Sequence, residues 1–115
     1  MVTVRTHKDE EVEIKFGLGE LTKIDDELGF EVEKIRMGEG LEMLVPKLKT
    51  GNLIAISKII KCTLPTKKVP KKEEEVERVL INVIEDYGSL QAFGEKCIKK
   101  LKENLLTQDL VQEEE

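Results

Sequence analysis

The chain has 115 residues, of which 39% are hydrophobic, 37% are charged and only 3% are aromatic. This length fits a single domain with a modest core, which must consist mainly of Leu, Ile and Val. The formal net charge of −5 argues against a general nucleic-acid binder, and no apolar run is long enough to cross a membrane.

The first predicted element is a β-hairpin. Apolar and polar residues alternate in MVTVRTH and again in EVEIKF, which is the period of two expected for strands. The intervening HKDE predicts a tight turn, with strands paired between residues 2–6 and 11–16. The apolar face of this hairpin consists of Val2, Val4, Val12, Ile14 and Phe16. Two strands alone are marginally stable, so we expect this face to pack on the rest of the protein.

After Phe16 the apolar period becomes helical. The first helical stripe consists of Leu18, Leu21, Ile24 and Leu28, and Gly29 stands where a C-terminal cap is usual. FEVEKIRM follows and predicts a short extended link. The second helical stripe consists of Met37, Leu41, Leu44, Val45 and Leu48, and Pro46 inside it predicts a kink.

The third helix is the most apolar part of the chain. Gly51 is the expected residue after the second helix, and Asn52 is the expected N-cap of the third. One arc of the third helix gathers Leu53, Ile56, Ile59, Ile60 and Leu64. Ile54 falls outside that arc, so we expect this helix to be covered on more than one side.

Two further helices follow a linker, PTKKVPKK, at residues 65–72. The fourth helix opens with EEEVERV, and its stripe consists of Val76, Val79, Leu80, Val83, Ile84 and Tyr87. Gly88 then marks the end of the fourth helix, and Ser89 marks the start of the last helix. The stripe of the last helix consists of Leu90, Phe93, Cys97, Ile98, Leu101 and Leu105. The expected fold is α+β and mainly helical: an N-terminal β-hairpin packed on a bundle of four to five helices, in one domain of residues 1–106, with a flexible acidic tail at residues 107–115.

Charge is segregated along the chain. Residues 1–46 carry a net charge of −6, residues 47–72 carry +8, and residues 73–115 carry −7. The middle segment, from Lys47 to Lys72, contains eight lysines and no acid, and it overlaps the most apolar helix. Its lysines either rim a buried helix and balance the acidic segments, or form a basic patch for an acidic protein or nucleic acid. The absence of aromatic and arginine residues from the segment weakens the nucleic-acid alternative.

The residues that usually carry catalysis are sparse. His7 is the single histidine, and the sequence pairs it with no nucleophile. Cys62 and Cys97 lack the closely spaced ligands of a zinc site and are expected to be partly buried apolar residues. The glycines of GLGELT and GEGLEM complete no phosphate-binding motif. We therefore predict no catalytic, cofactor-binding or metal-binding residues and no enzyme activity.

The order of several motifs supports a family resemblance. A hairpin ending in KFGLGEL is followed by a helix ending near DELGF, by MGEGLEMLVPKLKTGN, and by an apolar helix with a proline-bounded linker. Over roughly residues 10 to 105, this pattern resembles the tail assembly chaperones of long-tailed (siphovirus-type) phages and prophages of Gram-positive bacteria. The lysine-rich linker and the QEEE end depart from the family pattern.

The resemblance implies a function in phage assembly. Such proteins act in the host bacterial cytoplasm, keep the tape measure protein soluble, help the tail tube protein polymerise around it, and are absent from the mature virion. A homo-oligomer is possible, and no cofactor or membrane is implied. The alternative is a small helical DNA-binding regulator that uses the basic block of residues 47–72.

The client-binding residues are predicted from two features. The end of the chain is apolar on a second face, which suggests a docking arm that orders against a partner helix. The basic segment suggests the second surface, since its charge would repel other copies of the protein while an acidic or amphipathic client docks. The candidate residues are Leu105, Leu106, Leu110, Val111, Lys58, Lys61, Lys67 and Lys68. The alternative for the arm is a frayed end whose leucines fold back on the bundle.

Overall fold

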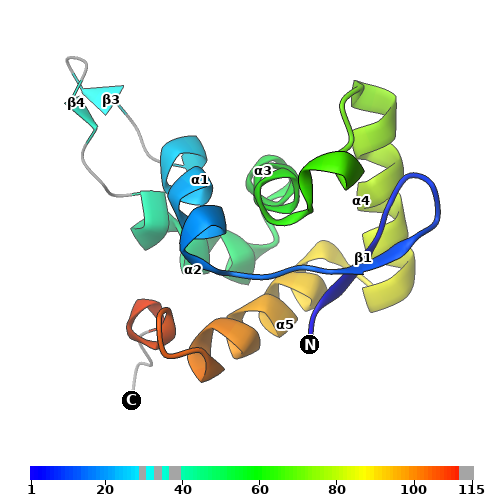
Figure 1. The fold of residues 1–115 in the computed structure, drawn as a ribbon. Coiled ribbons are helices and arrows are strands. Elements are labelled where there is room, and N and C mark those ends of the chain that lie inside the picture. Colours follow the sequence, from blue (N-terminus) through cyan, green and yellow to red (C-terminus); the bar gives the residue numbers. More distant parts are fainter. Residues whose placement is uncertain (29–30, 33–34, 37–39, 112–115) are drawn as a thin grey trace.

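The computed structural model describes residues 1–28, 31–32, 35–36 and 40–111 (Figure 1). In these ranges an antiparallel hairpin precedes five α-helices, which confirms the expected mainly helical α+β fold. The hairpin strands are β1 (Thr3–Arg5) and β2 (Glu11–Glu13). The helices are α1 (Leu18–Leu28), α2 (Gly40–Thr50), α3 (Leu53–Thr63), α4 (Glu73–Tyr87) and α5 (Leu90–Glu103).

The hairpin forms as predicted. Val4 lies opposite Val12 in the antiparallel register, so both side chains are on one face. The apolar residues of this face join the core, with Val12 partly buried and the others fully buried. Thr6 closes the turn because its hydroxyl oxygen accepts hydrogen bonds from the backbone N–H groups of Lys8 and Glu10. β1 packs against α4, which gives the hairpin the support that two strands need.

A second, very short hairpin lies between α1 and α2. β3 (Glu31–Val32) pairs antiparallel with β4 (Ile35–Arg36), where the sequence predicted an extended link. Gly29 and Met37 lie outside the described residues, so the predicted cap of the first helix and the predicted start of the second stripe are not seen. Pro46 lies inside α2, as expected.

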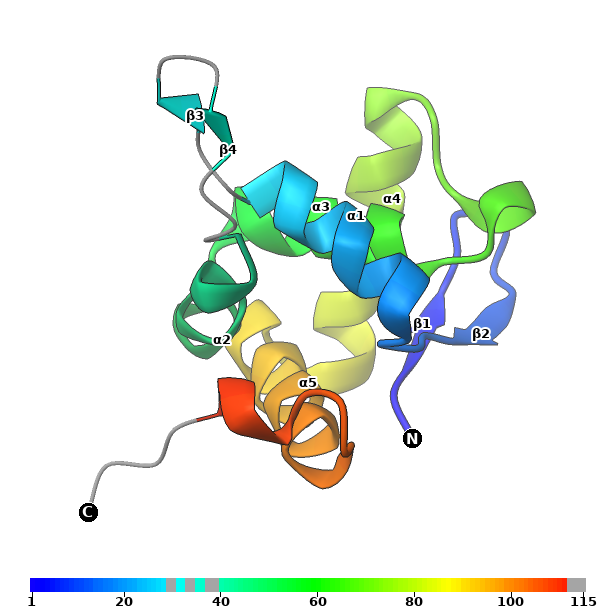
Figure 2. The same ribbon diagram turned by 60° about the vertical axis from the view of Figure 1, so that its left-hand side comes forward.

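The helices form a bundle around one core. α2 packs against both α1 and α5, α3 packs against α1, and α4 packs against α5 (Figures 1 and 2). The largest fully buried side chains come from the hairpin and from every helix, and they include Phe16, Ile24, Leu44, Ile59, Val79 and Phe93. The core is therefore shared by the β1–β2 hairpin and the five helices.

The predicted helix boundaries follow from local capping. Gly51 adopts a left-handed φ of 68°, which favours glycine and ends α2. The side-chain oxygen of Asn52 then accepts a hydrogen bond from the backbone N–H of Ala55 at 2.9 Å, which caps α3. Ser89 does the same for α5 by accepting from the N–H of Ala92 at 3.0 Å. These stop and start signals place α3 and α5 where the sequence predicted them.

Candidate functional site

Large aliphatic side chains that remain exposed mark the surfaces where this protein can bind a partner, because covering them releases apolar area from water. In the described residues they cluster at the ends of helices and on the outer face of α4. They are Leu18, Leu53, Ile54, Ile81, Ile84, Leu105 and Leu106. Most of them line, or extend, two open grooves.

The first groove, here called the α3–α4 groove, has a volume of about 390 Å³. It is lined by Leu53, Ile54, Ser57, Lys61, Lys71, Glu73, Val76, Glu77 and Leu80. Its apolar surface comes from the start of α3 and from one face of α4. Ile84 lies one helical turn beyond Leu80 on that face and extends it toward the end of α4.

The exposure of two groove residues corrects the sequence prediction. Leu53 was expected in the buried arc of the third helix, and Ile54 was expected to be covered by another element, but Ile54 is 62% exposed and Leu53 is also exposed. The reason is that α4 packs on α5 and β1 instead of closing over the start of α3. Ile84, predicted on the buried stripe of the fourth helix, is exposed as well.

The second groove, here called the α1–α2 groove, has a volume of about 330 Å³. It is lined by Leu18, Leu21, Thr22, Asp25, Leu41 and Leu106. A carboxylate oxygen of Asp25 accepts a hydrogen bond from the backbone N–H of Leu41 at 2.9 Å, which ties α1 to the first turn of α2. Leu18 was predicted in the core but is 73% exposed, because it is the first residue of α1 and projects into this groove.

The C-terminal segment supplies one wall of the α1–α2 groove. Leu106 is 67% exposed and lines the groove, whereas Leu105 is 83% exposed and lines neither groove. The last helix was predicted to include Leu105 on its buried side, but α5 ends at Glu103. Leu110 and Val111 are half-buried against the core, so the structure places the four predicted arm residues in different surroundings.

Thr107, where the sequence predicted the start of a flexible tail, is buried in the structure. Its hydroxyl donates a hydrogen bond to the backbone carbonyl oxygen of Leu101 at 2.7 Å. A short 3₁₀ turn, Gln108–Leu110, follows and packs against α5. Residues 112–115, which hold the acidic end, lie outside the described residues.

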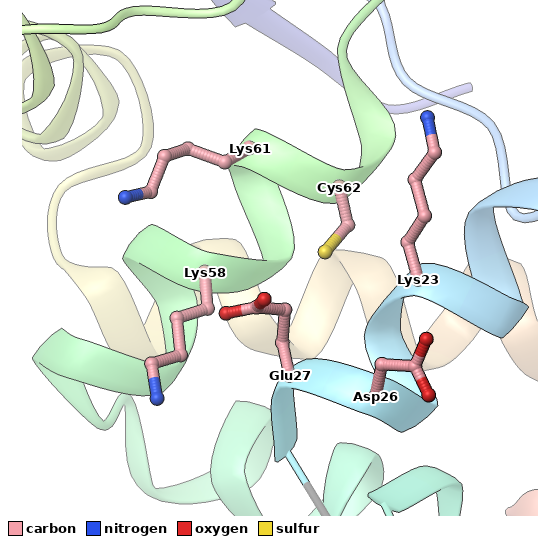
Figure 3. Close-up of a pocket in the computed structure, with 6 residues that line it drawn as sticks. All are labelled: Lys23, Asp26, Glu27, Lys58, Lys61 and Cys62. Carbon is pink, nitrogen blue, oxygen red and sulfur yellow. The ribbon is translucent and has the colours of Figure 1, made fainter.

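A charged cleft between α1 and α3 contains two of the predicted lysines (Figure 3). It has a volume of about 310 Å³ and is lined by Lys23, Asp26, Glu27, Lys58, Lys61 and Cys62. The lining of the cleft thus combines two lysines from α3 with two acids and one lysine from α1. Lys61 lines both this cleft and the α3–α4 groove.

The other two predicted lysines lie in the turn between α3 and α4. Lys67 and Lys68 belong to a 3₁₀ turn, Thr66–Lys68. The ammonium group of Lys68 forms an ion pair with a carboxylate oxygen of Glu10 at 2.9 Å, and this contact lowers the pKa of Glu10. The basic segment is therefore divided between a cleft facing α1 and a turn bound to the hairpin.

The thiols are poorly suited to nucleophilic chemistry. Burial raises the pKa of Cys62 to about 11 and that of Cys97 to about 12. A protonated, desolvated thiol is inert compared with a thiolate. In the described residues no three His, Cys, Asp or Glu side chains are grouped so that they could hold a metal ion. No helix in the same part of the chain combines the length and hydrophobicity that a membrane crossing requires.

Sequence reasoning missed most groove residues. One signal was present in the sequence. Ile54 falls outside the buried arc of its helix, so its side chain could have been predicted to be exposed. For Leu18 and Leu53 the sequence offered only their positions at the first turn of a helix, where a neighbouring element often fails to reach.

Comparison with known proteins identifies the family. The family model of the phage tail assembly chaperone protein, TAC, matches residues 6–114, which is nearly the whole chain. No significant match was found to a curated protein or to a solved structure. The match spans β2, all five helices of the described residues and both grooves. The chain belongs to the phage tail assembly chaperone family.

Proposed function

We propose that this protein binds the tape measure protein during tail assembly, keeps it soluble, and helps the tail tube protein polymerise around it. The observation that supports this proposal best is the pair of open apolar grooves on a small, highly charged protein. A long helical client exposes apolar faces until the tube encloses it. Grooves lined by Leu and Ile can cover such faces.

The charged surroundings of the grooves suit a chaperone that must stay dispersed. Lys61, Glu73 and Glu77 lie at the α3–α4 groove, and Asp25 lies at the α1–α2 groove. Charges beside an apolar surface disfavour contact between copies of the same surface and favour a partner with complementary charges. The net charge of −5 adds a general repulsion between copies.

The rest of the proposal follows from this function. The protein acts by binding rather than by catalysis, it requires no cofactor, and its partners are the tape measure protein and the tail tube protein. It works in the cytoplasm of the host bacterium and leaves before the virion is complete. No observation favours the alternative of a DNA-binding regulator, since Lys58 and Lys61 share a cleft with acids and Lys68 is paired with Glu10.

Co-expression tests the proposal directly. The tape measure protein is produced alone and with the full chain, and the soluble fraction is measured after centrifugation. We expect the tape measure protein to be mainly insoluble alone and mainly soluble with the chaperone. A tail tube protein is then added to the soluble complex, and tube formation is followed by electron microscopy. If the tape measure protein stays insoluble in the presence of the folded chain, the proposal is wrong.

A further inference from the structure

From the shape and charge of the α3–α4 groove, we infer that it binds one amphipathic α-helix with a basic edge and an acidic edge on either side of an apolar stripe. This inference rests on the proposed function, which makes the tape measure protein the source of the helix. It goes further by assigning the surface and the charge pattern of the segment that docks there.

The apolar part of the groove suits a helix. Val76 and Leu80 lie one turn apart on the groove face of α4, and Leu53 and Ile54 face them from the start of α3. Ile84 continues the face by one more turn. From Glu73 to Ile84, α4 offers a rise of about 16 Å, which corresponds to roughly three turns of a docked helix. Aliphatic anchors at i, i+3 or i+4 and i+7 would fill this length.

The groove is lined by four charged residues: Glu73 and Glu77 on α4, Lys71 two residues before α4, and Lys61 on α3. Glu73 and Glu77 are four residues apart and lie on the same edge of α4, whereas Lys61 projects from α3. Within the described part of the chain, none of these three side chains forms an ion pair. Other charged residues nearby are paired, as in Lys68 with Glu10. Along α4 the groove therefore presents two unpaired acids, with Lys71 beyond the end of this acidic edge, and Lys61 is the unpaired base on the α3 side.

This charge pattern determines which helix can bind in the groove and in which direction that helix runs. A helix with Lys or Arg four residues apart on one edge would pair with Glu73 and Glu77. An acidic residue on its opposite edge would pair with Lys61. A uniformly acidic or uniformly basic helix would place like charges against one edge, which costs affinity. A nucleic acid, being uniformly negative, would be repelled by the two glutamates.

Site-specific crosslinking tests the location. Benzoylphenylalanine is placed at Ile54 in the full chain, which is co-expressed with the tape measure protein and irradiated. The control carries the same photoreactive group at Lys99 on α5, which is exposed and lines neither groove. We expect crosslinks from position 54 to map to a segment with an apolar stripe and opposite charges on its edges. Crosslinks to a second copy of the chain, or to segments without this pattern, would overturn the inference.

Charge reversal tests the complementarity. The variant Glu73→Lys/Glu77→Lys should weaken binding of the crosslinked segment about fivefold to tenfold in a fluorescence anisotropy titration. The control Glu74→Lys/Glu95→Lys changes the net charge equally at exposed positions outside the groove, and it should bind within about twofold of the original chain. Ile54→Ser should weaken binding about tenfold or more, while Lys99→Ser, at an exposed position outside both grooves, should not.

Rescue separates charge pairing from damage to the fold. Exchanging the basic edge of the client segment for glutamates should restore its binding to Glu73→Lys/Glu77→Lys and weaken its binding to the original chain. If the groove variants and their controls bind alike while the original chain still keeps the tape measure protein soluble, the groove is not the docking site. If the original chain does not keep the tape measure protein soluble at all, the proposed function itself fails.

Discussion

The hydroxyl of Tyr87, at the end of α4, binds both backbone polar groups of Thr3 in β1. It donates a hydrogen bond to the carbonyl oxygen of Thr3 at 2.7 Å and accepts one from its N–H at 3.2 Å. The contact joins residues 84 positions apart in the sequence. Arg5 reinforces the same junction through ion pairs with Glu85 at 3.0 Å and Asp86 at 3.1 Å.

Replacing Tyr87 by Phe should destabilise the protein by about 1 to 2 kcal/mol, because two backbone groups of an edge strand lose their partner. The aromatic contact with Phe93, with ring centroids 5.2 Å apart, should survive the change. Urea denaturation followed by circular dichroism measures the difference. A midpoint unchanged from that of the original protein would show that water replaces the hydroxyl at no cost.

Ile60 tests the buried face of α3. It is almost fully buried, so Ile60→Asp should cost several kcal/mol, on the order of 3 to 5, because an unpaired charge enters the core. Lys58→Asp, on the cleft side of the same helix, should cost less than about 1 kcal/mol. Thermal melting of both variants provides the comparison. Equal melting temperatures for Ile60→Asp and the original chain would contradict the assigned core face.

Gly94 tests the close approach of α5 and α2. A Cβ atom at this position would clash with the backbone carbonyl oxygen of Leu48, so an alanine forces the two helices apart. We expect Gly94→Ala to cost about 3 kcal/mol, although alanine is the better helix former. The neighbouring exposed substitution Glu95→Ala is the control and should be nearly neutral. A stabilised Gly94→Ala variant would show that the helices can separate freely.

Glu75 predicts a dependence of stability on pH. Its carboxylate accepts hydrogen bonds from the backbone N–H groups of Lys71 at 3.0 Å and Lys72 at 3.1 Å, which lowers the pKa of Glu75. Because the folded-state pKa lies below the unfolded one, the stabilisation is complete above the unfolded-state pKa and is lost as pH falls through the folded-state pKa.

The Glu75→Gln variant should therefore have a lower melting temperature than the original protein at pH 7. This difference in melting temperature should shrink as the pH falls below about 4. Glu74→Gln, in the same turn of α4, serves as the control for the general effect of removing a charge from the start of a helix. A gap that is constant from pH 7 to pH 3 would show that the two backbone hydrogen bonds do not depend on the carboxylate charge.

The C-terminal segment needs a test that separates stability from binding. Truncation after Asn104 removes Leu106 but also the buried Thr107, so we expect it to lower the melting temperature. Leu106→Ser should leave the melting temperature nearly unchanged and reduce the amount of soluble tape measure protein in co-expression. Leu105→Ser is the matched control. If Leu106→Ser keeps the tape measure protein as soluble as the original chain does, the α1–α2 groove is not a client site.

Local signals in the sequence were sufficient to predict the first hairpin and the five helices, but not the short β3–β4 hairpin. Alternation identified the hairpin, and the pairs Gly51 with Asn52 and Gly88 with Ser89 placed the helix boundaries. These predictions succeeded because strand period and helix capping depend on residues within a few positions of each other.

The grooves could not be predicted in the same way. An apolar stripe shows which face of a helix tends to be buried, but whether a neighbour reaches the whole stripe depends on how the helices pack. Leu18 and Leu53 were assigned to the core because they continue their stripes, yet both lie on the first residue of a helix, where the neighbouring element stops short. The hydrogen bond between Tyr87 and Thr3 could not be predicted either, because no pattern of neighbouring residues indicates a contact between segments so far apart in the sequence.

The junction between β1 and α4 also has a consequence for synthesis on the ribosome. Thr3 emerges long before its partner, because Tyr87 follows 84 residues later. At a translation rate of 5 to 20 residues per second, this delay lasts roughly 4 to 17 s. During that time the apolar side chains of Val2 and Val4 lack the helix that supports the hairpin. A nascent tail assembly chaperone thus passes through a period in which apolar residues of its first strand have not yet met the helix that supports them.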